Sequence, residues 1–410
     1  MKLNKLYFAA LLLMAGACTP TKLHLEIQNP TDQDRVTETI EIPVSEINSR
    51  LKTAQGNDFI IRDQAGQEIA WQLTSDQTVI FPITLKAGEH RHYTLTRGKS
   101  TPADTIAYGQ VYPARFDDLA WENDKVSFRA YGPALQAKGE HGFGYDLFAK
   151  RGTDYPVLKE MYKKETDKAL KMKIKELRVT DPERAKVLQQ QKSYHIDHGY
   201  GMDCYAVGPT LGAGVAALLD EGQIVYPWCW KDVEFLDNGP LRFKVKLTFT
   251  PLEACGHEDL IETRIITLDA GARLNKTTIT YEGLDTEEAI VSGIVLHDHN
   301  DAIRTEAESG WISYQDPTTG PGKGLLYLGH AVAGPLKDAR VEYFSDEESA
   351  ARNNAKGHVL AESVYEPAEG FTYWWGFGWS KADIPTYEDW NAYMTVIAAQ
   401  LRHSLVITFR

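Results

Sequence analysis

Apolar and polar residues alternate in short segments along the first quarter of the chain, and turn-forming residues such as Asn29 and Pro30 separate these segments. The alternating segments are 23–27, 36–42, 59–61, 69–73, 79–83 and 92–95. A period of two, broken by turns at this spacing, is typical of antiparallel strands that bury one face. We therefore expect a small N-terminal β-sandwich domain over 18–98, followed by a polar linker that ends near Asp104.

The rest of the chain also predicts strands, which are longer and richer in aromatic residues. Clear examples are the segments 125–131, 241–249, 274–281, 290–296 and 405–409. Two stretches differ: 157–191 is rich in Lys, Glu, Leu and Gln, and Thr386 begins a capping box with Asp389 ahead of apolar residues at helical spacing. So many strands with only two helical insertions indicate a mainly β domain of stacked antiparallel sheets over 105–410, closed by the last strand.

The first residues have the pattern of a secretory signal over 1–17. A basic start precedes an apolar run at 6–14, and small residues lead through Ala17 to Cys18. The apolar run is too short to span a bilayer. A cysteine at this place predicts lipidation of Cys18, and the lack of acidic residues after it favours the periplasmic side of the cell envelope. An ordinary signal peptide with a chance cysteine is the alternative.

Charge and cysteine content limit the partners and the covalent links. The formal net charge of −13 argues against nucleic acid and against a polybasic membrane surface. The mature chain has no second long apolar stretch, so its membrane attachment would be by lipid alone. Cys204, Cys229 and Cys255 allow either one disulfide with a leftover thiol or three buried thiols. The sequence leaves the pairing and the oligomeric state open.

The densest group of chemically versatile residues lies at 194–205, where two His, two Asp and three Tyr stand among glycines. Histidine can act as a base near neutral pH, and a phenol can give or take a proton. We expect His195 or His198 to be a base and Tyr200 an acid, with Asp203 binding substrate. A solvated loop with hydrogen-bonded histidines is the alternative.

A second group surrounds His297 and His299, which would share one face of a strand. Together with His195 and His198 they could hold a divalent metal ion, because imidazoles suit zinc and similar ions. No ordered ligand motif supports such a site, so we expect no cofactor. His297 remains a predicted substrate-binding residue.

A third group combines Arg129 with Tyr131 on one strand face. The arginine fork matches a carboxylate in bidentate geometry, and Tyr131 would bind substrate beside it. Trp121, Tyr226 and Trp375 come from aromatic-rich segments and could stack on a sugar ring. Packing in the core is the alternative for each of these rings.

Missing motifs narrow the functional classes further. The chain has no P-loop, dinucleotide fingerprint, HExxH, Gly-x-Ser-x-Gly elbow or paired CxxC. Most nucleotide-dependent, hydride-transferring and serine-hydrolase functions are thereby excluded.

Four segments of the chain resemble a known family. They are Arg115-Phe-Asp-Asp-Leu-Ala-Trp-Glu-Asn-Asp, Phe128-Arg-Ala-Tyr-Gly-Pro-Ala-Leu, His198-Gly-Tyr-Gly-Met-Asp-Cys-Tyr-Ala-Val-Gly-Pro-Thr-Leu-Gly and Leu236-Asp-Asn-Gly-Pro-Leu-Arg. The chain resembles the domain-of-unknown-function family 4861 of polysaccharide-degrading Bacteroidetes over nearly its whole mature length. The resemblance implies a galactose-mutarotase-like supersandwich, a fold that hosts epimerases, hydrolases and polysaccharide lyases. It also implies work on oligosaccharides, with a link to removal of water from a terminal uronic acid.

These observations predict β-elimination on uronic-acid-containing oligosaccharides, by a dehydratase or lyase. The reaction needs a cation to neutralise the carboxylate, a base for the proton next to it and an acid for the leaving oxygen. Arg129 is expected to be the cation, His195 or His198 the base and Tyr200 the acid, with Tyr131 in reserve.

Two other functions stay open at this point. A glycoside hydrolase would use paired carboxylates such as Glu122, Asp197 and Asp203. A non-catalytic glycan-binding lipoprotein would need the aromatic residues and no base. The fold class does not choose among the three functions.

Overall fold

The computed structural model describes residues 22–51, 59–152 and 157–410 of the chain. The predicted signal segment and the predicted lipidation site Cys18 lie outside the described residues. No helix within those ranges is both long enough and apolar enough to cross a membrane.

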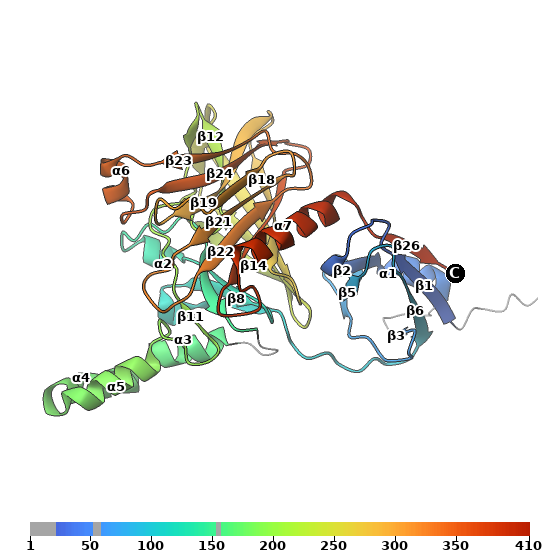
Figure 1. The fold of residues 1–410 in the computed structure, drawn as a ribbon, viewed down its shortest axis with the longest axis horizontal. Helices are drawn as coiled ribbons and strands as arrows, with labels where there is room; N and C mark the ends of the chain where they lie inside the picture. Colours follow the sequence, from blue (N-terminus) through green and yellow to red (C-terminus); the bar gives the residue numbers. More distant parts are fainter. Residues whose placement is uncertain (1–21, 52–58, 153–156) are drawn as a thin grey trace, which may run out of the picture.

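The small domain is a sandwich of two antiparallel sheets, as the alternating pattern predicts (Figure 1). One sheet has the order β26 (Val406–Phe409), β1 (Lys22–Gln28), β6 (His90–Arg97) and β3 (Phe59–Asp63). The other has the order β2 (Arg35–Pro43), β5 (Thr78–Leu85) and β4 (Gln72–Leu73). Their inward side chains form a separate core, which helix α1 (Val44–Leu51) also lines.

The last strand belongs to the small domain, although the sequence analysis placed it in the large domain over 105–410. Strand β26 pairs with β1 of the small domain, with Phe409 opposite Leu25. Leu405, Ile407 and Phe409 pack against the small-domain core. The strand therefore protects an edge of the small sheet instead of closing the large domain. Its alternation predicts a strand but does not say which sheet it joins.

In the described residues the large domain contains three antiparallel sheets, which confirms the predicted mainly β supersandwich. The largest has the order β14 (Trp230–Asn238), β15 (Arg242–Phe249), β17 (His257–Asp269), β18 (Leu274–Glu282), β25 (Phe371–Trp379), β22 (Leu326–Ala331), β21 (Trp311–Asp316) and β20 (Ile303–Glu306), with β16 (Leu252–Ala254) paired to β17. A second has the order β13 (Gln223–Ile224), β12 (Ala216–Asp220), β19 (Glu288–Leu296), β24 (Gly357–Tyr365) and β23 (Asp338–Tyr343). The third has the order β11 (Gly201–Asp203), β10 (Asp146–Lys150), β9 (Ser127–Ala130), β8 (Asp118–Glu122) and β7 (Tyr108–Tyr112). One apolar core joins side chains from all three sheets.

Two helical regions lie where the sequence predicts them. The segment 157–191 forms α3 (Leu158–Thr166), α4 (Lys168–Thr180) and α5 (Pro182–Lys192), and the α4–α5 hairpin projects away from the sheets (Figure 1). Helix α7 (Tyr387–Arg402) begins with the predicted capping box and runs from the large domain toward the small one. The short α1, α2 (Pro133–Gln136) and α6 (Asp346–Ala351), and the 3₁₀ turn at Pro113–Arg115, were not predicted.

Candidate functional site

The five-stranded sheet that contains β8 to β11 carries charged side chains on its outer face. Asp118 (β8), Arg129 (β9), Asp146 (β10) and Asp203 (β11) come from four neighbouring strands, and Arg129 is directly opposite Asp146. The alternate side chains of these strands belong to the apolar core. Because side chains alternate between the two faces of a strand, an arginine and three carboxylates lie on one surface of this sheet.

A helix and a loop cover this charged surface. Tyr162 of α3 and Tyr194, which precedes β11, pack with Phe148 and Ala120 of the same sheet face. Gly201 lets β11 approach closely, because a Cβ there would lie 1.9 Å from the carbonyl oxygen of Ala149. The result is a buried polar group rather than an open charged patch.

Arg129 is bound by the carboxylates of its own chain. Its Nη2 donates a hydrogen bond to Asp146 and lies 3.5 Å from Asp203 Oδ2, and its Nη1 lies 3.7 Å from Asp118 Oδ2. The residue is only 4% exposed. The prediction that Arg129 clamps a substrate carboxylate is therefore wrong, because the guanidinium already serves as the counter-ion of buried aspartates.

Burial also raises the pKa values of two carboxyl groups in this cluster toward neutral pH. Burial raises the pKa of Asp118 to about 6, against the opposing effect of Arg129. Burial, and then the neighbouring Asp146, raise the pKa of Asp203 to about 7. A carboxyl group that titrates near neutral pH is suited to acid–base chemistry.

His195 connects this buried group to solvent. Its Nδ1 lies 3.3 Å from the carbonyl oxygen of Asp203 and 3.7 Å from the carboxylate Oδ2 of the same residue. The side chain is 58% exposed, yet partial burial still lowers the pKa of the imidazole. If Nδ1 donates to the carbonyl oxygen, Nε2 carries the lone pair of a neutral base.

The positive charge of Lys323 acts on His195 and Asp203, in addition to the larger effect of burial on both groups. The ammonium lowers the pKa of both His195 and Asp203, and its Nζ donates to Thr319 Oγ1 at 2.8 Å. The loop of Lys323 is joined to β11, because the amide of Thr319 donates to the carbonyl oxygen of Cys204. His195 and Asp203 are thus in contact, and the loop that carries Lys323 is attached next to them through Thr319 and Cys204.

Tyr205 joins this group to a histidine–aspartate pair. Its hydroxyl is buried and has no hydrogen-bond partner among the described residues. Burial raises the pKa of Tyr205, and the charges of Asp316 and Asp146 raise it further. The ring contacts His297 edge-on at 5.2 Å, and His297 Nδ1 lies 2.5 Å from Asp316 Oδ2. The prediction that His297 binds substrate stays a prediction.

Comparison with known proteins identifies the family. The sequence profile described as "Domain of unknown function (DUF4861)" matches residues 27–407. The chain belongs to this family. The match confirms the resemblance seen in the four motif segments.

Individual relatives extend the comparison. The chain is 26% identical to "Uncharacterized protein P7" of Formosa agariphila over 429 residues, which is 99% of this chain and 98% of that protein. Among solved structures it is similar to a glycosyl hydrolase family 38 protein from Enterococcus faecalis, with a TM-score of 0.46 and 8% identity over 95% of this chain and 47% of the other. An alpha-mannosidase from the same organism gives a TM-score of 0.45 with 8% identity, over 95% of this chain and 46% of the other. The chain thus spans about half the length of these two structures.

His198 and Tyr200 belong to the covering loop instead of the acid–base group. His198 Nε2 lies 3.0 Å from the carbonyl oxygen of Ser193, and the Tyr200 hydroxyl lies 3.4 Å from Lys164 of α3. Within the described ranges neither side chain forms a hydrogen bond or ion pair with Asp203. Their predicted action together with Arg129 in one cleft stays a prediction.

Two carboxylates of the predicted hydrolase set have structural roles. Glu122 is buried and accepts hydrogen bonds from Lys150 Nζ at 2.8 Å and from the first amides of the α3 segment, at Val157 and Leu158. Asp197 pairs with Arg151 and accepts from two backbone amides of its own turn. Both carboxylates therefore help to hold the covering segment on the sheet, and Asp203 is the member of that set that contacts His195.

Two predicted sugar-stacking rings are core residues. Trp121 is fully buried and donates from Nε1 to Asn275 Oδ1 at 2.8 Å. Trp375 is also fully buried and stacks on Tyr145 with the ring centroids 4.3 Å apart. Their prediction as substrate-binding residues is wrong, because neither ring presents a free face. Tyr226 is half-buried and stays a candidate.

Neither a shared metal site nor a disulfide is formed in the described parts of the chain. Those parts contain no group of three or more His, Cys, Asp or Glu arranged to hold a metal ion, so the four histidines considered for one do not converge. His299, for example, contacts Tyr343 with the ring centroids 4.9 Å apart. Cys204, Cys229 and Cys255 are free thiols.

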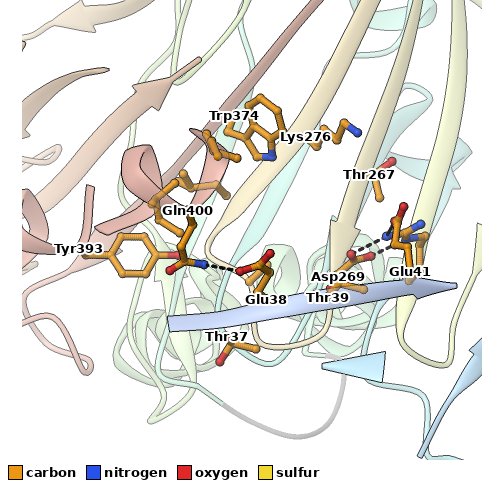
Figure 2. Close-up of a pocket in the computed structure, with 15 residues that line it drawn as sticks. Thr37, Glu38, Thr39, Glu41, Thr267, Asp269, Lys276, Trp374, Tyr393 and Gln400 are labelled. Atoms are coloured by element: carbon orange, nitrogen blue, oxygen red, sulfur yellow. Dashed lines mark hydrogen bonds and ion pairs between the residues drawn. The ribbon is translucent and has the colours of Figure 1, made fainter. Parts of the chain in front are cut away.

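A cavity of about 190 Å³ lies between the two domains, away from these residues. Arg242 on its wall pairs with Asp269 at 2.7 Å and with Glu41 of the small domain at 2.5 Å. Gln400 of α7 donates to Glu38 of β2 at 3.2 Å, as Figure 2 shows. Arg242 thus pairs with carboxylates of both domains, and this cavity is a polar junction between them.

Sequence reasoning did not single out Asp118, Asp146 or Lys323. The alternation of strand residues could have indicated Asp146. In Asp146-Leu-Phe-Ala-Lys the first, third and fifth residues share one face of the strand. Asp118 has the same relation to Glu122. No sequence pattern near Lys323 indicated a role for it, because its loop and β11 are distant in sequence and are joined only in the folded protein.

Proposed function

We propose that this protein is a carbohydrate-active enzyme that acts on uronic-acid-containing oligosaccharides by β-elimination, as a dehydratase or lyase. The observation that carries the proposal is the exposed imidazole of His195, whose Nδ1 lies 3.3 Å from the carbonyl oxygen of Asp203. Elimination next to a carboxylate requires a neutral base and a cation, and we assign these roles to His195 and to Lys323, whose charge acts on the imidazole.

The step follows from these positions. Lys323 pairs with the uronate carboxylate and makes the proton on the adjacent carbon more acidic. His195 Nε2 removes that proton, the electron pair forms a carbon–carbon double bond, and the carbon–oxygen bond at the next carbon breaks. The imidazolium then gives its proton to the leaving oxygen, which departs as water from a terminal unit or as a hydroxyl of the released sugar. The Asp203 carboxylate stabilises the imidazolium, and no redox partner is needed.

The test is incubation of the purified chain with oligosaccharides that end in different uronic acids. Elimination is expected to produce ultraviolet absorbance from a double bond conjugated to the carboxylate. A new reducing end without that absorbance would indicate a glycoside hydrolase, and binding without any product would indicate a glycan-binding protein.

Activity should depend on pH through His195 and Asp203, which must both be deprotonated and whose pKa values burial shifts in opposite directions. His195 must be neutral, and the pKa of its imidazole is lowered, so protonation should impair it only in acid. Asp203 has a pKa of about 7, so its carboxylate gains the charge that supports the imidazolium as the pH rises through 7. We expect kcat/KM to rise from pH 5 to pH 8, and Asp203→Asn to remove the part of the rise near pH 7. A profile of this variant parallel to that of the wild-type protein would exclude Asp203 from this role.

The proposal includes attachment to the cell envelope on the periplasmic side through a lipid on Cys18, because a secretory pattern and small residues precede this cysteine. A Cys18→Ala protein is expected to lose lipid label and to leave the membrane fraction after cell fractionation. Retention of both in the variant would contradict the anchor.

A further inference from the structure

Four aromatic rings from two loops form a connected surface group in the large domain, here called the aromatic platform: His141, Phe143, Tyr226 and Trp228. His141 meets Trp228 edge-on at 4.6 Å, and Phe143 lies 5.4 Å from Tyr226 and 6.4 Å from Trp228. Trp228 is 42% exposed, so much of a large ring remains open to solvent beside its neighbours. Such an exposed aromatic surface marks a site of interaction.

A cleft of about 370 Å³ adjoins the platform at His141. Tyr131 lines this cleft, and its hydroxyl donates to Asp146 Oδ2 at 2.9 Å. Gly142 lets the backbone of this wall pack closely on the Tyr131 ring, because a Cβ there would lie 2.3 Å from that ring. One face of the cleft is therefore in hydrogen-bond contact with the residues that surround Arg129.

Arg352 adds positive charge at the other side of the platform. Its guanidinium lies over the Tyr226 ring at 4.6 Å from the centroid, and its Nη1 donates to the carbonyl oxygen of Pro209, which lines the cleft. The Phe344 ring also contacts this guanidinium, 5.0 Å from its centroid, and among the described residues Nε and Nη2 donate no hydrogen bond. The contact with Tyr226 orients the fork and leaves two donor atoms for a ligand.

We propose that the aromatic platform and Arg352 bind an acidic pyranose unit of the substrate, beyond the unit that reacts at His195. Its apolar ring face lies against Trp228, and its carboxylate pairs with Arg352. An aromatic face matches the C–H face of a sugar, and a guanidinium matches a carboxylate, so the combination selects a uronic acid rather than a neutral sugar. The assignment of a sugar as ligand rests on the proposed function.

The test compares binding of a uronate oligosaccharide with binding of the same oligosaccharide after its carboxyl groups are reduced to alcohols. Isothermal titration calorimetry on the whole protein gives both dissociation constants. We expect Trp228→Ala to weaken binding of both ligands about tenfold, which is about 1.4 kcal/mol. We expect Arg352→Gln to weaken binding of the uronate form alone. The matched control is Phe235→Ala, which removes a ring of similar exposure (38%) outside the platform and should change neither constant.

Kinetics separate this inference from the proposed function. In Trp228→Ala, KM should rise while kcat stays at the wild-type value, because the variant leaves His195 intact. Wild-type binding constants for both ligands in Trp228→Ala would overturn the platform, even if elimination is observed. Loss of binding in that variant, in a protein that yields no unsaturated product, would support the platform while overturning elimination.

Discussion

Replacement of His195 by alanine is expected to lower kcat/KM on uronate-ended oligosaccharides by about a hundredfold or more, as the loss of a positioned base usually does. The imidazole is the exposed member of the group, held at Nδ1 by Asp203. Its removal deletes the proton acceptor and leaves the buried aspartates and Arg129 in place. The measurement is initial rate by ultraviolet absorbance, with the melting temperature recorded for the same preparation.

The matched control is His198→Ala. This histidine lies three residues away on the same loop, and its Nε2 lies within hydrogen-bond distance of the carbonyl oxygen of Ser193. Among the described residues it forms no hydrogen bond or ion pair with Asp203. We expect nearly wild-type turnover and little change in melting temperature. If His195→Ala is as active as this control, the base must lie elsewhere. If both variants lose activity with a lower melting temperature, the loop acts through structure.

Arg129→Met is expected to lower the free energy of unfolding by about 3–5 kcal/mol at neutral pH, which is the usual cost of removing one partner from a buried ion pair. The methionine fills much of the space, but Asp118, Asp146 and Asp203 lose their shared cation. Chemical denaturation measures the change. Arg50→Ala, which removes an exposed pair with Glu46, should change stability by only about 0.5 kcal/mol.

The pH dependence of this loss gives a second check on its cause. Burial raises the pKa of Asp118 to about 6 and that of Asp203 to about 7, so both are largely protonated at pH 5. Protonated carboxyls need no cation, so the destabilisation caused by Arg129→Met should be smaller at pH 5 than at pH 8. An equal loss at both values would show that packing, and not charge, is the main contribution of Arg129.

The sequence predicts the local elements of the fold well, because alternation and capping are local signals. The alternating segment 36–42 lies within β2, and Thr386 caps α7 through Asp389 as expected. The pairing of β26 with β1 could not be predicted, since many strand edges would satisfy the same backbone groups. Strand alternation specifies a face, whereas the partner across the sheet comes only from topology.

The site was predicted in part for the same reason. Arg129, Asp203 and His195 were recognised as chemically capable residues, and the structure brings them together. The role of Arg129 was predicted wrongly because its partner is distant in sequence. Asp146 of the next strand accepts a hydrogen bond from its guanidinium. Trp121 and Trp375 were ambiguous because an aromatic residue in a strand serves equally well as a core side chain, and both rings are buried.

The central claim is elimination by the His195 group, and the most direct test is the mass of the product formed in water enriched in oxygen-18. We expect an unsaturated product without the heavy isotope, and for a terminal unit a mass lower than that of the substrate by one water. A product that carries oxygen-18 at a new reducing end would contradict elimination and identify hydrolysis.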